Sequence, residues 1–339
     1  MVGRLPRLAH QLEIHARLEG RLLHRLVELF GGDARAAAGR DEETAGQALA
    51  IAERVGDPEL IGWALRVRTI AAMQAGRYDE AAAGSERILS LLDQIRDPGN
   101  RETLVENTAL RVAAATGRFD DARRFSELVS GLVADLTPHN RLHGVAYELE
   151  IEELAAGWER IRQIEPRVER AVDENRDTPC VRNARSLLVC ALAEAALGDD
   201  AAASRFENLA STLGIEGHDR ELTAPRLRLA MLRGDVAEAR RLLGGYGRPT
   251  MRFMFDMAGA MTWLDASAAL GSPEEVEREA PALAVPGTCV EPFALRALGT
   301  VRNDASLLEL ADARFTELGM QWYAVQGSMP QGLPGQAGR

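Results

Sequence analysis

The sequence contains no lysine, so all 40 of its basic residues are arginine, and 51 acidic residues outnumber them. The resulting net charge of −11 repels phosphate backbones, which argues against nucleic acid as a direct partner. Every apolar run is too short to cross a bilayer, and no apolar stretch typical of a secretory signal follows Arg4 and Arg7. These absences predict a soluble, cytoplasmic protein with no membrane partner.

Cysteines and strand-forming patterns are also scarce. The three cysteines, Cys180, Cys190 and Cys289, are odd in number and irregularly spaced, so they match neither a disulfide framework nor a CxxC zinc pattern. Aromatic residues make up only 5% of the chain, and β-branched residues form no alternating runs. The apolar residues are mostly alanine and leucine, which favour closely packed helices. We therefore predict an all-α fold.

Glycine recurs at a period typical of helical repeats. The clearest copies are Gly-Arg-Tyr-Asp-Glu-Ala from Gly76 and Gly-Arg-Phe-Asp-Asp-Ala from Gly117. Because glycine readily adopts the left-handed conformation that ends a helix, each copy predicts a turn between two helices. Five weaker copies start at Gly39, Gly157, Gly198, Gly234 and Gly271. The spacings between the seven successive glycines are 37, 41, 40, 41, 36 and 37 residues.

A second register is formed by proline. An Asp or Thr side chain can cap the free N–H groups of a helix, and proline suits the first helical position, so each such pair predicts a helix start. The repeat unit is thus a first helix of about 17 residues, a glycine turn and a second helix of similar length. Four pairs recur at spacings of 40, 40 and 41 residues: Asp57-Pro58, Asp97-Pro98, Thr137-Pro138 and Thr178-Pro179.

Helical hairpins of this kind bury their apolar faces by stacking on one another. We predict a right-handed α–α solenoid of about seven to eight hairpins. It spans residues 1–326, begins with an amphipathic helix from Leu8 to Phe30, is regular over 39–214 and irregular over 215–326. The Gly-, Pro- and Gln-rich tail 327–339 is predicted to be disordered.

The turns at Gly76 and Gly117 resemble the inter-helix turn of tetratricopeptide (TPR) repeats, although the period exceeds the TPR period of about 34. Residues 48–60 and 313–322 are similar to repeat joints and to the closing helix in the C-terminal regions of bacterial LuxR-type regulators and ATPase-linked adenylate/guanylate cyclases. The resemblance implies a sensory or regulatory arm. The sequence has neither the GxxxxGK[ST] loop nor the basic helix-turn-helix of those proteins.

In a TPR-like solenoid the first helix of each hairpin lines a concave groove. Arginines on such a surface would suit a ligand that carries a carboxylate or phosphate. The alternative is that each arginine forms an interhelical salt bridge with one of the abundant acidic residues. Counting back from each glycine turn, the predicted groove residues are Trp63, Arg66, Asn107, Arg111, Tyr147, Arg185, Arg228, Met231, Met261 and Asp265.

Histidine, cysteine and glutamate side chains are the remaining candidates for metal-binding or catalytic groups. His139 and His143 have the spacing of a helical metal pair, but the sequence shows no third ligand at a matching offset, so we predict solvated or capping histidines. Cys180 and Cys190 are predicted to be packed thiols. The cluster of Glu148, Glu150, Glu152 and Glu153 is predicted to be a solvated helix face. We predict no catalytic residue, no cofactor and no metal.

The leading hypothesis is a non-enzymatic interaction or sensory module that binds a peptide, a partner segment or a small anionic ligand in its groove. One alternative is an enzyme that uses the cavity of a curved solenoid, with Tyr147, Asp265 and arginines converging. Another alternative is an oligomerisation scaffold, in which an apolar patch from Met251 to Trp263 pairs in a symmetric interface.

Overall fold

The computed structural model describes residues 38–215, 217–247, 251 and 254–325, with side chains from Ala45 onward. Every regular element in these ranges is a helix, which confirms the all-α prediction. The predicted helix from Leu8 to Phe30 and the predicted disordered tail lie outside the described residues. None of the described helices combines the length and apolar character that crossing a membrane requires.

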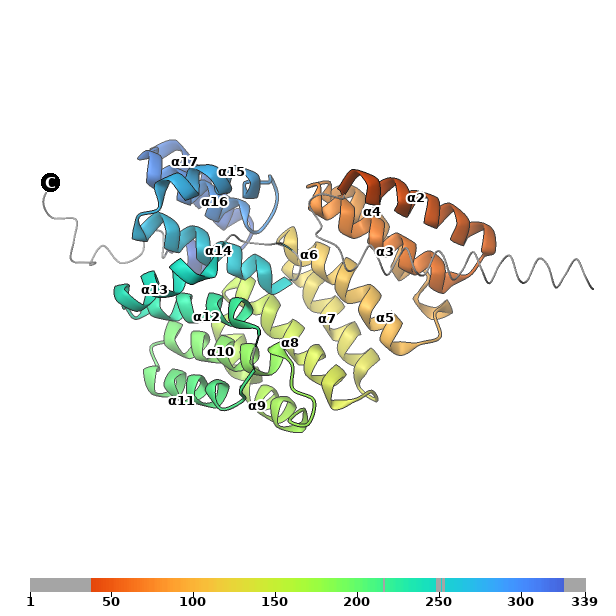
Figure 1. Ribbon diagram of the computed structural model, residues 1–339, viewed down its shortest axis with the longest axis horizontal. Coiled ribbons are helices and arrows are strands. Elements are labelled where there is room, and N and C mark those ends of the chain that lie inside the picture. The colour runs from red at the N-terminus through yellow and green to blue at the C-terminus, as the bar shows by residue number, and fades with distance from the viewer. Residues whose placement is uncertain (1–37, 216, 248–250, 252–253, 326–339) are drawn as a thin grey trace, which may run out of the picture. The chain divides into compact units, whose positions relative to one another are not determined.

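The chain divides into two compact units, with the boundary between Ala109 and Leu110. Unit 1 has its core between α2, α3, α4 and α5, where Leu49, Leu65, Ile88 and Leu104 are buried together. Its helices, red to orange in Figure 1, are α2 (Ala38–Val55), α3 (Pro58–Gln74), α4 (Tyr78–Leu89), the 3-10 turn η1 (Leu92–Gln94) and α5 (Pro98–Val105). The π-helical turn η2 (Glu106–Leu110) contains the boundary.

Unit 2 consists of helices that pack on the next helix along the chain, except that α11 does not pack on α12. This neighbour-on-neighbour packing is consistent with the expected stack of hairpins. The helices are α6 (Arg111–Ala115), α7 (Phe119–Val133), α8 (Pro138–Ala155), α9 (Trp158–Glu174), α10 (Val181–Ala196), α11 (Asp200–Ser211), α12 (Asp219–Leu232), α13 (Val236–Tyr246), α14 (Met254–Leu270), α15 (Pro273–Leu283), α16 (Glu291–Arg302), α17 (Ala305–Glu317) and α18 (Gln321–Val325).

Three of the four proline pairs start helices as predicted. Asp57 Oδ1 accepts a hydrogen bond of 2.9 Å from Glu59 N at the start of α3, which spans the expected 17 residues. Asp97 and Thr137 cap α5 and α8 in the same way. The prediction is wrong at Thr178-Pro179, because α10 starts at Val181. There the side chain of Asn183 accepts from Cys180 N at 2.9 Å, so the capped start lies further along the chain.

The glycine register marks real helix ends at five of its seven positions. Gly76, Gly117, Gly198, Gly234 and Gly271 all have positive φ, the conformation that ends a helix. The other two positions differ: Gly39 lies inside α2, and at Gly157 the preceding Ala156 takes the left-handed conformation with φ 56°. A turn therefore occurs near Gly157, although glycine itself does not supply it.

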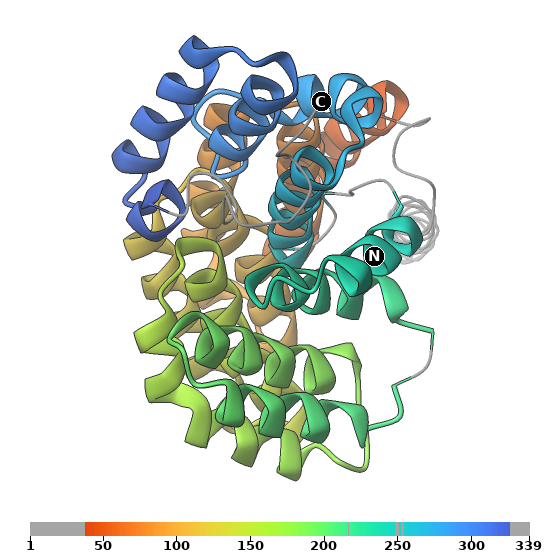
Figure 2. The ribbon, with the colours of Figure 1, turned by 90° about the vertical axis from the view of Figure 1, so that its left-hand side faces the viewer.

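Helix α14 covers the inner layer of helices in unit 2. The first helices of successive hairpins, α8, α10, α12, α14 and α16, each contact the next and form an inner layer. In addition, α14 packs on α8 and α6, which are far earlier in the chain. Figure 2 shows α14 crossing the middle of the unit. Side chains that would face an open groove in a gently curved stack are therefore covered.

Candidate functional site

The predicted groove residues divide between the two units. Trp63, Arg66 and Asn107 belong to unit 1, and all three are half-buried. The others belong to unit 2. The side chain of Asp265 is only 8% exposed, although its exposure as a whole residue is intermediate. The remaining residues are buried: Arg111, Tyr147, Arg185, Arg228, Met231 and Met261.

Unit 1 brings Trp63, Arg66 and Asn107 together, and we name this group the Trp63 cluster. Trp63 and Arg66 lie about one turn apart on α3, and the guanidinium carbon of Arg66 is 5.2 Å from the centre of the Trp63 ring. Arg66 Nη2 donates a hydrogen bond of 3.1 Å to Asn107 Oδ1. A guanidinium, an indole and an amide in contact can together bind a carboxylate or phosphate and stack on a planar group.

The π-helical turn η2 positions Asn107 in this cluster. Asn107 Nδ2 donates to Thr103 O at 3.0 Å and to the carboxylate of Glu106. Single π turns inside α-helices are frequent at functional sites. On the opposite element, Gly62 permits α3 to lie close to α5, because a Cβ at this position would be 3.0 Å from Leu104 Cδ1. The helical periodicity predicted an uninterrupted helix and gave no sign of the π turn.

Buried arginines of unit 2 are paired with carboxylates of neighbouring inner helices, whereas Arg111 donates to the carbonyl oxygen of Met251. Arg185 Nη2 on α10 lies 2.7 Å from Glu153 Oε2 on α8, and both side chains are at most 5% exposed. Asp265 on α14 is shared, because its two oxygens lie 2.6 Å from Arg228 Nη1 and 2.8 Å from Arg296 Nη2. Unit 2 therefore contains the interhelical salt bridges that were the alternative to ligand-binding arginines.

These buried charges support one another electrostatically. Burial by itself would lower the pKa of Arg228, but the Asp265 carboxylate at its side keeps that pKa above its ordinary value. Burial raises the pKa of Glu153, and the Arg185 charge acts in the opposite direction. Each charge depends on its partner, since removing one member of a buried pair leaves an uncompensated charge, which costs on the order of 3–5 kcal/mol of stability.

The closing helix α18 reaches the same interior. Tyr323 OH donates a hydrogen bond of 2.9 Å to Glu153 O, and Arg296 Nη1 donates one of 2.8 Å to Tyr323 O. Burial raises the pKa of Tyr323, so its hydroxyl is a donor near neutral pH. An external anion would have to displace these internal partners to reach Arg185, Arg228 or Arg296.

The acidic cluster on α8 corrects a sequence-based prediction. Glu150, Glu152 and Glu153 are at most 4% exposed, so the prediction of a solvated helix face is wrong for these three, whereas Glu148 is of intermediate exposure. The reason is that arginines from neighbouring helices pair with them. Arg123 on α7 makes two bonds of 2.7 and 2.9 Å to Glu152, and Arg182 on α10 contacts Glu150 at 3.0 Å.

The structure also locates the residues on which the two alternative hypotheses, an enzyme cavity and an oligomerisation patch, depend. Tyr147 and Asp265 lie buried in the packed interior of unit 2. A cavity of about 320 Å³ lies elsewhere, between α13, α14 and α15, and charged residues such as Arg240, Glu275 and Arg278 line it. Met254, Met257, Met261 and Trp263, from the proposed oligomerisation patch, are at most 3% exposed.

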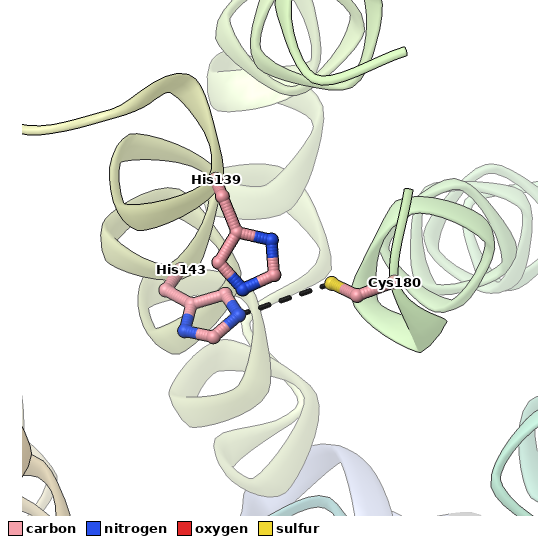
Figure 3. A group of neighbouring side chains, drawn as sticks. All are labelled: His139, His143 and Cys180. Atoms are coloured by element: carbon pink, nitrogen blue, oxygen red, sulfur yellow. Dashed lines mark hydrogen bonds between the residues drawn. The ribbon is translucent and has the colours of Figure 1, made fainter. Parts of the chain in front are cut away.

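One group of side chains in the described part of the chain has the composition of a metal site. His139 and His143 on α8 face Cys180, the residue before α10, and one ligand atom from each lies within 4.8 Å of the others (Figure 3). Burial, together with the nearby Arg182 and His139, lowers the pKa of His143 to about 3, so its imidazole is neutral at physiological pH. The spacing of the two histidines is visible in the sequence, but their proximity to Cys180 is not, since a partner contributed by another helix leaves no signal in local spacing.

Comparison with protein-family models, with curated proteins and with solved structures found no match for this chain. The interpretation of its function therefore depends on the chemistry of its own side chains.

Proposed function

We propose that the chain is a TPR-like α–α solenoid that acts as a non-enzymatic interaction or sensory module. Its binding surface is the Trp63 cluster, and its occupant is a partner segment or small ligand that carries a carboxylate or phosphate. The observation that carries this proposal is that Trp63, Arg66 and Asn107 retain solvent access. In unit 2 the buried residues Arg182, Arg185, Arg228 and Arg296 already have carboxylate partners within the chain.

Two further observations are consistent with an interaction module that works in the cytoplasm. Most successive helices pack on their neighbours, and arrays of this kind commonly present extended binding surfaces. The described cysteines are all free thiols, which suits the reducing cytoplasm as the working compartment.

The test is a selection of displayed random peptides on the full chain, followed by calorimetric titration of the selected peptides. Inorganic phosphate and citrate serve as small anionic probes. Arg66→Gln removes the charge while retaining a polar side chain, and we expect it to weaken binding by about 30-fold, the effect of a hot-spot residue. Trp63→Ala should weaken binding to a similar extent, with the melting temperature recorded to verify folding.

Arg68→Gln is the matched control. Arg68 lies on the same helix, is exposed and contacts Glu80 at 3.3 Å rather than the Trp63 cluster. Affinity that is unchanged in Arg66→Gln, or reduced equally by Arg68→Gln, would contradict the assignment of this surface. Failure of every peptide and anion to bind would contradict the proposed function itself.

A further inference from the structure

The start of α8 and the start of α10 bring together three metal-ligating side chains. His139 and His143 are separated by one helical turn, so their rings project from the same face of α8. Their ring centres are 4.5 Å apart. Cys180 precedes α10, which packs against α8, and Figure 3 shows its thiol beside both rings. The group thus combines residues that are 37 positions apart in sequence.

The distances fit a tetrahedral ion. A Zn²⁺ ion bound by imidazole and thiolate separates a nitrogen from a sulfur by about 3.6 Å and two nitrogens by about 3.4 Å. Cys180 Sγ lies 3.8 Å from His143 Nε2, and no pair of the three ligand atoms is more than 4.8 Å apart. Side-chain rotations that move atoms by the order of 1 Å would complete the coordination.

An outer shell holds His139 in a ligating orientation. Its Nδ1 lies 3.4 Å from the carbonyl oxygen of Thr178 in the loop before α10. Metal-bound histidines commonly donate their second ring N–H to a carbonyl or carboxylate, which fixes the ring and selects the ligating nitrogen. With Nδ1 engaged in this way, Nε2 is the nitrogen offered to a metal.

A buried asparagine pair holds the loop that carries Thr178 and Cys180. Asn183 Oδ1 accepts hydrogen bonds from Cys180 N at 2.9 Å and from Asn175 Nδ2 at 3.0 Å. Asn175 Oδ1 in turn accepts from Thr178 Oγ1 at 2.7 Å. Asn175 and Asn183 are at most 1% exposed. Two buried amides that fix both the thiol and the outer-shell carbonyl provide the rigid support that a metal site needs.

The electrostatic surroundings allow a cation. Arg182 lies near His143, but its charge is offset by Glu150 Oε1 at 3.0 Å, and its guanidinium lies 4.6 Å from the Tyr147 ring centre. The three ligand residues are all of intermediate exposure, so a metal and a further ligand such as water can reach them. Two imidazoles and one thiolate prefer Zn²⁺ and other borderline or soft ions over Mg²⁺ or Ca²⁺.

We infer that His139, His143 and Cys180 form a binding site for a Zn²⁺-type transition-metal ion, with a fourth coordination position open to solvent. The ion links the starts of α8 and α10 and so couples two successive hairpins of unit 2. The inference goes beyond the proposed binding function and does not depend on it, because the Trp63 cluster belongs to unit 1.

The test uses the reduced, metal-free, full-length chain without an affinity tag. Co²⁺ is titrated as a spectroscopic probe and is then displaced with Zn²⁺. We expect a single equivalent of Co²⁺ to produce thiolate-to-cobalt charge-transfer absorption together with the visible bands of four-coordinate Co²⁺. Zn²⁺ should also raise the melting temperature, since a ligand that binds only the folded state stabilises it.

Three variants separate this site from other metal binding. Cys180→Ser should abolish the charge-transfer absorption, and His143→Gln should weaken Zn²⁺ binding by more than about 100-fold, beyond the effect of losing an outer-shell partner. Cys190→Ala is the matched thiol control, because Cys190 is fully buried in α10, and it should retain the absorption. Circular dichroism of each variant verifies that it is folded.

Two results would overturn the inference. One is charge-transfer absorption that persists in Cys180→Ser. The other is Zn²⁺ affinity that is unchanged in a folded His139→Gln/His143→Gln variant, which would assign the binding to other residues such as His10, His15 and His24.

Discussion

Unit 1 and unit 2 differ in how deeply they bury arginines from the first helices of their hairpins. In unit 1, Arg66 is half-buried, lies against Trp63 and donates to the neutral amide of Asn107. In unit 2, Arg185 and Arg228 are buried and each contacts a carboxylate within 2.7 Å. All three arginines were predicted to line a groove, but the surroundings of their guanidinium groups differ.

The difference indicates what decides whether an arginine on these helices forms an internal ion pair. An inner helix that contributes an acidic residue opposite the arginine converts it into an internal ion pair, and the cover provided by α14 and α18 removes water from that pair. A partly solvated arginine held by a neutral amide can still form a charge-assisted bond with an incoming anion.

The largest expected effect is that of breaking a buried pair. Arg185→Ala leaves the Glu153 carboxylate buried without its 2.7 Å partner, and we expect a loss of about 3–5 kcal/mol in the free energy of unfolding. Urea unfolding of the full chain measures this loss. In the control Arg185→Met/Glu153→Leu, which removes both charges, most of the stability should return. A loss below about 1 kcal/mol in Arg185→Ala would show that the interior of unit 2 admits water.

A smaller loss is expected from the buried asparagine pair. Asn183→Ala removes the acceptor of the Cys180 and Asn175 N–H groups, and leaving buried polar groups unpaired costs about 1–3 kcal/mol. The same urea experiment applies. The exposed Asn208→Ala provides the control and should change stability by less than about 0.5 kcal/mol. An equal loss of stability in the two variants would show that Asn183 contributes no more to stability than an exposed asparagine.

Unit 2 should also show a pH dependence that arises from Glu165. Burial and a hydrogen bond to Glu194 raise the pKa of Glu165 from 4.5 to about 8, against the opposing charges of Arg205 and Arg162. The folded state then holds this proton more tightly than the unfolded state. The stabilisation is fully present below pH 4.5 and is lost as pH rises toward about 8.

Hydrogen exchange of α9 and α10 as a function of pH measures this effect. Glu165→Gln cannot ionise, so the loss of protection with rising pH should be smaller in that variant. The exposed Glu86→Gln on α4 provides a matched loss of one carboxylate in unit 1. Identical pH profiles for the wild type and Glu165→Gln would show that Glu165 is not the group responsible.

The smallest effect on stability is expected in unit 1. Arg66→Gln breaks a partly solvated hydrogen bond to Asn107, so the free energy of unfolding should fall by less than about 1 kcal/mol. Urea unfolding of this variant beside Arg185→Ala compares the two environments directly. A loss as large as that of Arg185→Ala would mean that Arg66 is also a structural arginine.

Local patterns in the sequence predicted the helices well, for reasons that are visible in particular residues. Asp57-Pro58 and Asp97-Pro98 cap and start helices, and Gly76 and Gly117 end them, because these effects involve neighbours within one turn. The candidate sites were only partly predictable. Trp63, Arg66 and Asn107 were named from the repeat register, but Cys180 was not recognised as a partner of His139 and His143.

The sequence by itself determined the helical class and most helix boundaries, since capping, glycine turns and apolar periodicity act over a few residues. Only the tertiary structure decided which charges are buried. Glu150, Glu152 and Glu153 read as a solvated face until arginines of α7 and α10 are placed beside them. Likewise, the His139, His143 and Cys180 group exists only because α8 and α10 pack together. Contacts between distant residues depend on how helices pack, and a one-dimensional period does not contain that information.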